Sequence, residues 1–194
     1  MMPPFPSPEF QDEAEAKAYL EQFLRPWFYL KPEVWLTYPS SANSLRIDYL
    51  AKPKPDTAFP FPIFGIECTA STYQGGIFNR AVKQAIDYAH CQICDRRPSL
   101  TGRSGQRVER VYIFPPPPQP PDQDYMRGWH ASVERVAGLF HVGLIHIRFT
   151  GSPEFRMSGD RQWDADQGPI ATPTHQRQLV GNGTLRRSAD GAAP

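Results

Sequence analysis

The sequence has few cysteines, no long apolar run and almost no net charge, and each of these features excludes a class of protein. The three cysteines are an odd number and lack the regular spacings of a secreted disulfide framework. No run approaches the roughly 20 apolar residues that span a bilayer, so we expect no membrane partner. The formal net charge is +1, so any affinity for nucleic acid requires a local basic patch.

The first residues, MMPPFPSPEF, lack the basic and apolar segments of a signal peptide, and we therefore expect a cytoplasmic protein. The length of 194 residues allows one domain with a substantial core. We expect a Pro-rich leader over residues 1–8 and a folded domain over residues 9–150. Residues 151–194 are rich in Gly, Pro, Arg and Ser and have little periodicity, so a polar, largely irregular tail is expected there.

The hydrophobic pattern of the domain predicts an α/β fold. Ala16, Leu20 and Leu24 recur every four residues, which predicts a helix from Pro8 to Leu24. Short apolar runs between turn residues predict strands over 33–39, 44–53 and 61–71. After these we expect a helix over 77–97, a strand over 107–115, a helix over 125–140 and a strand over 142–150. Closely spaced strands favour antiparallel pairing and helix-separated strands favour parallel pairing, so the order αβββαβαβ predicts a mixed central sheet flanked by helices.

Two of the expected strands contain an acidic residue within an apolar run. Asp48 lies in RIDYL and Glu67 lies in GIEC. Carboxylates are depleted in strands and costly to bury unpaired. One interpretation is ion pairing, with Arg46 or Lys52 neutralising Asp48 and a helix residue neutralising Glu67. The other is a hard-cation site, because Mg²⁺ takes one or two carboxylates together with water and phosphate oxygens.

This arrangement resembles the PD-(D/E)XK nuclease superfamily, whose fold is restriction-endonuclease-like. That superfamily has an Asp at the end of the second strand and an acid-x-Lys triplet on the third. Asp48 matches the first position. Residues 67–69 align with the triplet, and Glu67 matches its acid. In the next helix, Gln84 and Tyr88 match the Gln-x-x-x-Tyr motif of the RecB-like branch. The expected order of elements from residue 8 to residue 150 is also the core order of the superfamily.

The resemblance implies a Mg²⁺- or Mn²⁺-dependent deoxyribonuclease that hydrolyses phosphodiester bonds. It implies that Asp48, Glu67 and the backbone carbonyl of Cys68 bind the metal, and that Glu13 of the first helix can complete the site. Strand alternation points the Cys68 thiol to the opposite face, where we expect it to be a small core group.

The triplet departs from the family pattern because Thr69 stands where the family has lysine. That lysine orients the attacking water and stabilises charge on the phosphate. Some members supply the ammonium from the following helix, and here Lys83 is the expected substitute, with Arg80 as the alternative. Five residues are expected to hold DNA, namely Arg80, Gln84, Tyr88, Lys52 and Lys54.

Two other functions remain open. The missing lysine is compatible with a catalytically inactive nuclease-fold protein that binds nucleic acid or a protein partner. The Pro-rich segments are compatible with an assembly protein that docks partners, although this explains neither acid. A homodimer is also possible under either reading.

Overall fold

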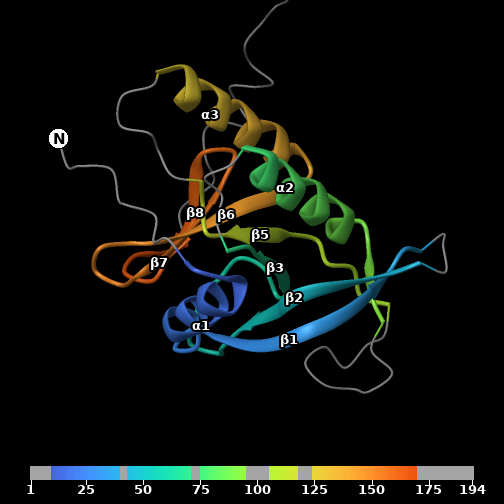
Figure 1. Cartoon of the computed structure of the whole chain (residues 1–194). Coiled ribbons are helices and arrows are strands. Elements are labelled where there is room, and N and C mark those ends of the chain that lie inside the picture. Colours follow the sequence, from blue (N-terminus) through green and yellow to red (C-terminus); the bar gives the residue numbers. More distant parts are fainter. Residues whose placement is uncertain (1–9, 40–42, 71–74, 95–104, 118–123, 170–194) are drawn as a thin grey trace, which may run out of the picture.

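The computed structural model describes residues 10–39, 43–70, 75–94, 105–117 and 124–169. Within these ranges the chain forms an α/β fold with a mixed nine-stranded sheet and three helices (Figure 1). The helices are α1 (Glu13–Leu24), α2 (Gly75–Ala89) and α3 (Asp124–Leu139). The strands are β1 (Phe28–Thr37), β2 (Ser44–Pro53), β3 (Phe64–Cys68), β4 (Gln92–Ile93), β5 (Val111–Phe114), β6 (Val142–Ile147), β7 (Pro153–Met157), β8 (Asp160–Asp164) and β9 (Gly168–Pro169). The expected mixed sheet with flanking helices is confirmed.

The strand order in the sheet is β4-β1-β2-β3-β5-β6-β7-β8-β9. Strands β1, β2 and β3 pair antiparallel, and β3, β5 and β6 pair parallel. This is the pattern that the spacing predicts, because hairpin connections reverse the chain and helical crossovers do not. The last strands, β7 to β9, add a second antiparallel portion.

The hydrophobic core consists of two clusters, one on each face of the sheet. The α1 cluster lies between α1 and the sheet and includes Leu20, Phe28, Phe64 and Phe155. The α2 cluster lies under α2 and α3 and includes Phe78, Ala85, Ile113 and Leu144. Figure 1 shows α1 on one side of the strands and α2 and α3 on the other.

At Glu33, the even-numbered side chains of strand β1 switch from one core cluster to the other. Phe28 and Leu30 pack with the α1 cluster, whereas Val34 and Leu36 pack with the α2 cluster, although all four are even-numbered. In a regular strand, residues two positions apart point to the same face. The exchange coincides with a backbone φ of 56° at Glu33, which is a left-handed conformation that residues other than glycine rarely adopt.

Strand β2 makes the same exchange opposite Glu33. Ile47 packs with the α2 cluster and Tyr49 packs with the α1 cluster. The residue between them is Asp48. The local exchange of faces therefore leaves Asp48 at the point where the β1–β2 ribbon crosses from one layer of the core to the other.

The boundaries of helices α1 and α2 differ from those that the sequence predicts. Helix α1 begins at Glu13, because the Asp12 side chain caps it by accepting a hydrogen bond from the Glu15 N–H at 2.8 Å. The helix expected to reach residue 97 ends at Ala89. Residues 92 and 93 instead pair with β1 as the short strand β4, which satisfies backbone groups of that edge.

The segment after Gly151 is not irregular in the part that the structure describes. Strands β7 and β8 form a hairpin whose two loop residues, Ser158 and Gly159, both have positive φ. Phe155 and Trp163 of this hairpin are buried, and their apolar surface explains why the segment packs on the sheet. The prediction of an irregular tail is therefore wrong for residues 153–169. Residues 170–194 and the expected leader over residues 1–8 lie outside the described residues.

In the described part of the chain, no helix has the length and apolar character needed to cross a membrane.

A close approach of strands at Gly143 gives a test of this packing. A Cβ atom at Gly143 would lie 2.3 Å from the Arg156 carbonyl oxygen and 2.7 Å from two ring carbons of Tyr112. We expect Gly143→Ala to lower the free energy of unfolding by about 2–3 kcal/mol, because strands must shift to admit the methyl group. Urea unfolding followed by circular dichroism measures this. Gly76→Ala is the control, since a Cβ atom there meets nothing within 4 Å, and equal stabilities of the two variants would contradict the prediction.

Candidate functional site

Asp48 and Glu67 face each other across neighbouring strands. Tyr49 pairs with Ile66 in the antiparallel β2–β3 ladder, so the next step places Asp48 opposite Glu67. The two side chains share a hydrogen bond. The backbone N–H of Cys68 donates a second hydrogen bond to Asp48 Oδ2 at 2.7 Å. The expected meeting of the two carboxylates on adjacent strands is confirmed.

Glu67 is buried, and its surroundings disfavour its charge. Burial raises the pKa of Glu67 to about 8, with further contributions from the negative charges of Asp48 and Glu13 and from the hydrogen bond to Asp48. A hydrogen bond with Tyr88 acts in the opposite direction. Near neutral pH, Glu67 therefore holds a proton, which it can share with the Asp48 carboxylate.

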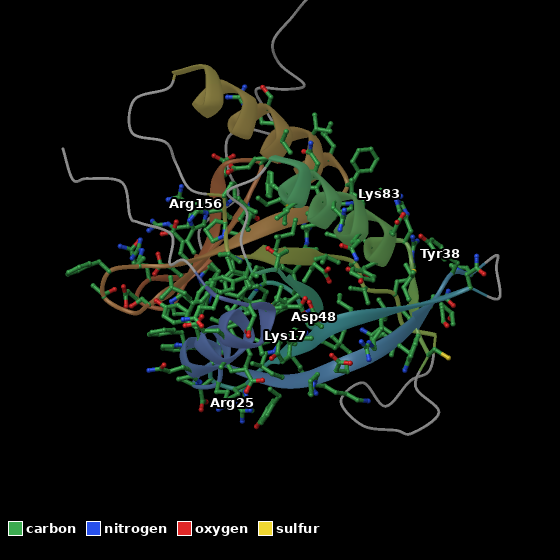
Figure 2. The ribbon with its side chains drawn as sticks, in the orientation of Figure 1. Lys17, Arg25, Tyr38, Asp48, Lys83 and Arg156 are labelled. Atoms are coloured by element: carbon green, nitrogen blue, oxygen red, sulfur yellow. The ribbon has the colours of Figure 1, made fainter. Side chains whose placement is uncertain are left out.

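The ammonium group at the site comes from Lys17 of α1, which sequence reasoning missed. Lys17 Nζ lies 2.6 Å from Asp48 Oδ1, 2.6 Å from Glu13 Oε1 and 3.7 Å from Glu33 Oε1. Figure 2 shows Lys17 and Asp48 together beside α1. Burial alone would lower the pKa of Lys17, but hydrogen bonds to Asp48 and Glu13 raise it well above its ordinary value. Lys17 is therefore fully charged at the site.

The sequence holds only a weak signal for Lys17. It lies one helical turn after Glu13, the acid of the first helix that the family resemblance offers to the site, but a solvent-facing lysine has the same spacing. The ion-pair interpretation was correct that Asp48 has a cationic partner, but it named the wrong residues. Lys52 is exposed on β2. Arg46 instead forms an ion pair with Glu33, with Arg46 Nη1 at 2.5 Å from Glu33 Oε2.

Of the site residues expected on α2, three are exposed and one is buried beside Glu67. Lys83, Gln84 and Arg80 are exposed, and Figure 2 shows Lys83 on α2, well away from Asp48. The structure therefore brings Lys17, and not Lys83, to the acids. Tyr88 is buried, and its side chain forms a hydrogen bond with Glu67. Its hydroxyl also donates to the Arg46 carbonyl oxygen at 2.9 Å. Its position suits it to orient Glu67 and not to contact DNA.

The remaining expected site residues lie as follows. The Cys68 thiol is buried in the α1 cluster, which confirms that it is a core group. Burial raises the thiol pKa well above its ordinary value, so the thiol stays protonated near neutral pH. Lys54 Nζ lies 5.6 Å from the centre of the exposed Tyr29 ring, on the part of the ribbon that follows Asp48. The Thr69 backbone N–H donates to the Phe114 carbonyl oxygen at 2.9 Å, which holds the end of β3 against β5.

The donor set at the site fits a hard divalent cation in number and chemistry. Among the residues that the structure describes, no three His, Cys, Asp or Glu side chains converge as a preformed metal cage. Asp48 and Glu67 nevertheless supply two adjacent carboxyl groups, and Mg²⁺ commonly takes only one or two from a protein. Burial is the main cause of the raised pKa of Glu67, and the charges of Asp48 and Glu13 add to it, so a cation bound here would favour the ionised form of Glu67.

Comparisons with known proteins found no relative of this chain. The chain matches no protein-family model, no curated protein and no solved structure. The resemblance to PD-(D/E)XK nucleases therefore stays a prediction from the sequence motifs.

Proposed function

We propose that this protein is a metal-dependent deoxyribonuclease in which Asp48 and Glu67 hold Mg²⁺ or Mn²⁺. The observation that carries the proposal is the pairing of these two carboxyl groups across β2 and β3, beside the ammonium group of Lys17. A chain gains nothing in stability by placing a second acid against the buried Glu67, whereas strongly shifted pKa values of this kind gather at functional sites.

Each group has a distinct role in the proposed reaction. When bound, a divalent cation would polarise a phosphate oxygen and acidify water. The Cys68 N–H fixes the Asp48 carboxylate, and Tyr88 fixes Glu67. Lys17 supplies the positive charge that the Thr69 position lacks, and it stabilises the negative charge that develops on the phosphate during attack.

The proposal includes the finer fold assignment. The elements from α1 to β6 follow the expected order αβββαβαβ once the short strand β4 is set aside. This order supports a restriction-endonuclease-like core, to which β4 and the β7–β9 portion are additions.

The alternative function is a nuclease-fold protein that binds nucleic acid without cutting it. One observation favours it, namely that Lys17 already neutralises Asp48 without any metal ion. An ion pair that satisfies Asp48 weakens the need for a cation at the site.

Removal of the metal separates these two functions. We expect purified protein to cleave linear or circular DNA with Mg²⁺ or Mn²⁺ and to lose about 10²-fold or more of that activity in chelator, since the carboxyl pair alone supplies no Lewis acid. Gel electrophoresis of the products measures this. Restoration of cleavage by added Mg²⁺ is the control. Binding of DNA with no cleavage under any metal would favour the alternative, and cleavage that persists in chelator would place the activity elsewhere.

A further inference from the structure

A continuous line of side chains leads from the surface of the β1–β2 ribbon to Asp48. The Arg46 guanidinium lies 6.0 Å from the centre of the Trp35 ring, Arg46 pairs with Glu33, Glu33 lies 3.7 Å from Lys17, and Lys17 pairs with Asp48. We call these five residues the approach surface. The exposed fraction of the side chain falls along it, from 55% at Arg46 and 45% at Glu33 to 20% at Lys17 and 14% at Asp48.

Trp35 is an aromatic platform at the outer end of the approach surface. The residue is 53% exposed, although an indole ring is among the side chains that gain most from burial. Its backbone is held on both sides, because Trp35 pairs with Arg46 of β2 and its carbonyl oxygen accepts the Cys94 N–H at 3.0 Å. The ring is therefore presented from a fixed part of the sheet and not from a loop.

We propose that Trp35 and Arg46 bind single-stranded DNA and direct it toward Asp48 and Glu67. A base stacks on the indole ring, and the Arg46 guanidinium contacts the neighbouring phosphate. The inference rests on the proposed function and adds a substrate class to it. A duplex hides the faces of its bases within its own stack, so it offers nothing for an exposed indole ring to stack on.

The charge on the approach surface is compatible with this ligand. Glu33 is an anionic side chain beside Arg46, and it is already paired with Arg46 and close to Lys17. The stacking contribution of Trp35 involves no ion release, so it is independent of salt, whereas the Arg46 contribution depends on salt. These two dependences distinguish a nucleic-acid contact from a merely structural role.

The chain contains a matched control on the same strand. Tyr29 of β1 is also an exposed aromatic residue, at 47%, and it also has a cation near its ring, Lys54. It lies on the other side of the Glu33 exchange, between Phe28 and Leu30 of the α1 cluster, and so points to the opposite face of the ribbon from those residues. Tyr29→Ala removes an equivalent platform that is not part of the approach surface.

The experiment is a binding titration in chelator, where cleavage plays no part. A fluorescently labelled oligothymidylate of about 12 nucleotides is the probe, and a duplex of the same length is the comparison. We expect wild type to bind the single strand more tightly than the duplex. Trp35→Ala should weaken single-strand binding by about 5- to 150-fold, the range for one base–aromatic stack, without changing its salt dependence. Trp35→Phe should restore most of the affinity, and Tyr29→Ala should bind as wild type does.

Arg46→Gln completes the test. It should weaken binding and reduce the slope of log affinity against log salt by about one, because one phosphate contact is lost. Equal binding by Trp35→Ala and wild type overturns the inference, as does a wild-type preference for the duplex or a failure to bind the single strand. A protein that binds the single strand through Trp35 but never cleaves supports this inference and refutes the proposed function. Metal-dependent cleavage that is unaffected by Trp35→Ala supports the proposed function and refutes this inference.

Discussion

Glu67→Gln should abolish metal-dependent cleavage and, in the absence of metal, make the protein more stable at alkaline pH. The amide cannot ionise, so it removes a metal ligand while it keeps the shape of the side chain and a hydrogen-bond donor toward Asp48. We expect cleavage to fall by about 10³-fold, the upper end of the loss seen when one preorganised charge is removed. Asp48→Asn should have a similar effect on cleavage, because it removes the opposite carboxylate.

The stability effect follows from the raised pKa of Glu67. The folded state holds the proton up to a pKa of about 8, whereas the ordinary pKa is 4.5, so the folded state binds more protons between these values. Stability therefore falls as pH rises through this window and remains low above it. At about pH 9, Glu67→Gln should exceed wild type in free energy of unfolding by about 2–4 kcal/mol, and at about pH 4 the difference should vanish.

Urea unfolding in chelator at both pH values measures this effect. Added Mg²⁺ provides the control, since it should stabilise wild type at alkaline pH and leave Glu67→Gln unchanged. Equal stability of wild type and variant at the alkaline pH would show that Glu67 ionises freely, and the crowded carboxyl pair would then be refuted.

Lys17→Met should reduce cleavage by about 10²–10³-fold while metal binding is kept. Methionine retains an unbranched apolar side chain against the sheet but removes the ammonium group, which lies 2.6 Å from Asp48. The loss should appear in the rate of cleavage, and half-maximal activity should need no more Mg²⁺ than in wild type, because the cation loses a competitor at Asp48. A purely structural role would instead lower stability and metal affinity together.

Lys83→Met is the matched control, because Lys83 is an exposed lysine on α2. It should cleave DNA at the wild-type rate. The opposite pattern, with Lys83→Met inactive and Lys17→Met active, would restore the assignment that the family resemblance favours. Lys17→Arg should recover part of the activity, since it restores the charge with a different geometry.

The two acids could be identified from sequence because a carboxylate within an apolar strand conflicts with the local pattern. Asp48 and Glu67 stand out among their neighbours, and hairpin spacing places their strands side by side. Lys17 could not be identified in this way, since a lysine on an amphipathic helix looks the same whether it faces solvent or a buried acid. Only the packing of α1 on β2 determines that it reaches Asp48.

Some parts of the fold could not be predicted from the sequence for similar reasons. The residues of β4 continue the helical spacing of α2, and only the open edge of β1 draws them into the sheet. Strands β7 and β8 are short and charged, and their buried acids are acceptable only because arginines reach them, as Arg148 reaches Glu154 at 2.8 Å. The positive φ of Glu33 has no signature in the sequence, since glycine or asparagine is the usual choice for that conformation.

The exchange of faces at Glu33 links the mechanics of the two core layers to the site. Residues before Glu33 are held by the α1 cluster, and residues after it are held by the α2 cluster. A displacement of either helix layer is therefore transmitted along the ribbon to the position of Asp48, without any intervening loop. The same geometry makes the length of β1 critical. One residue inserted between Leu30 and Glu33 would shift the exchange of faces in β1 away from its place opposite Asp48, while the β2–β3 pairing that brings Asp48 to Glu67 involves other strands.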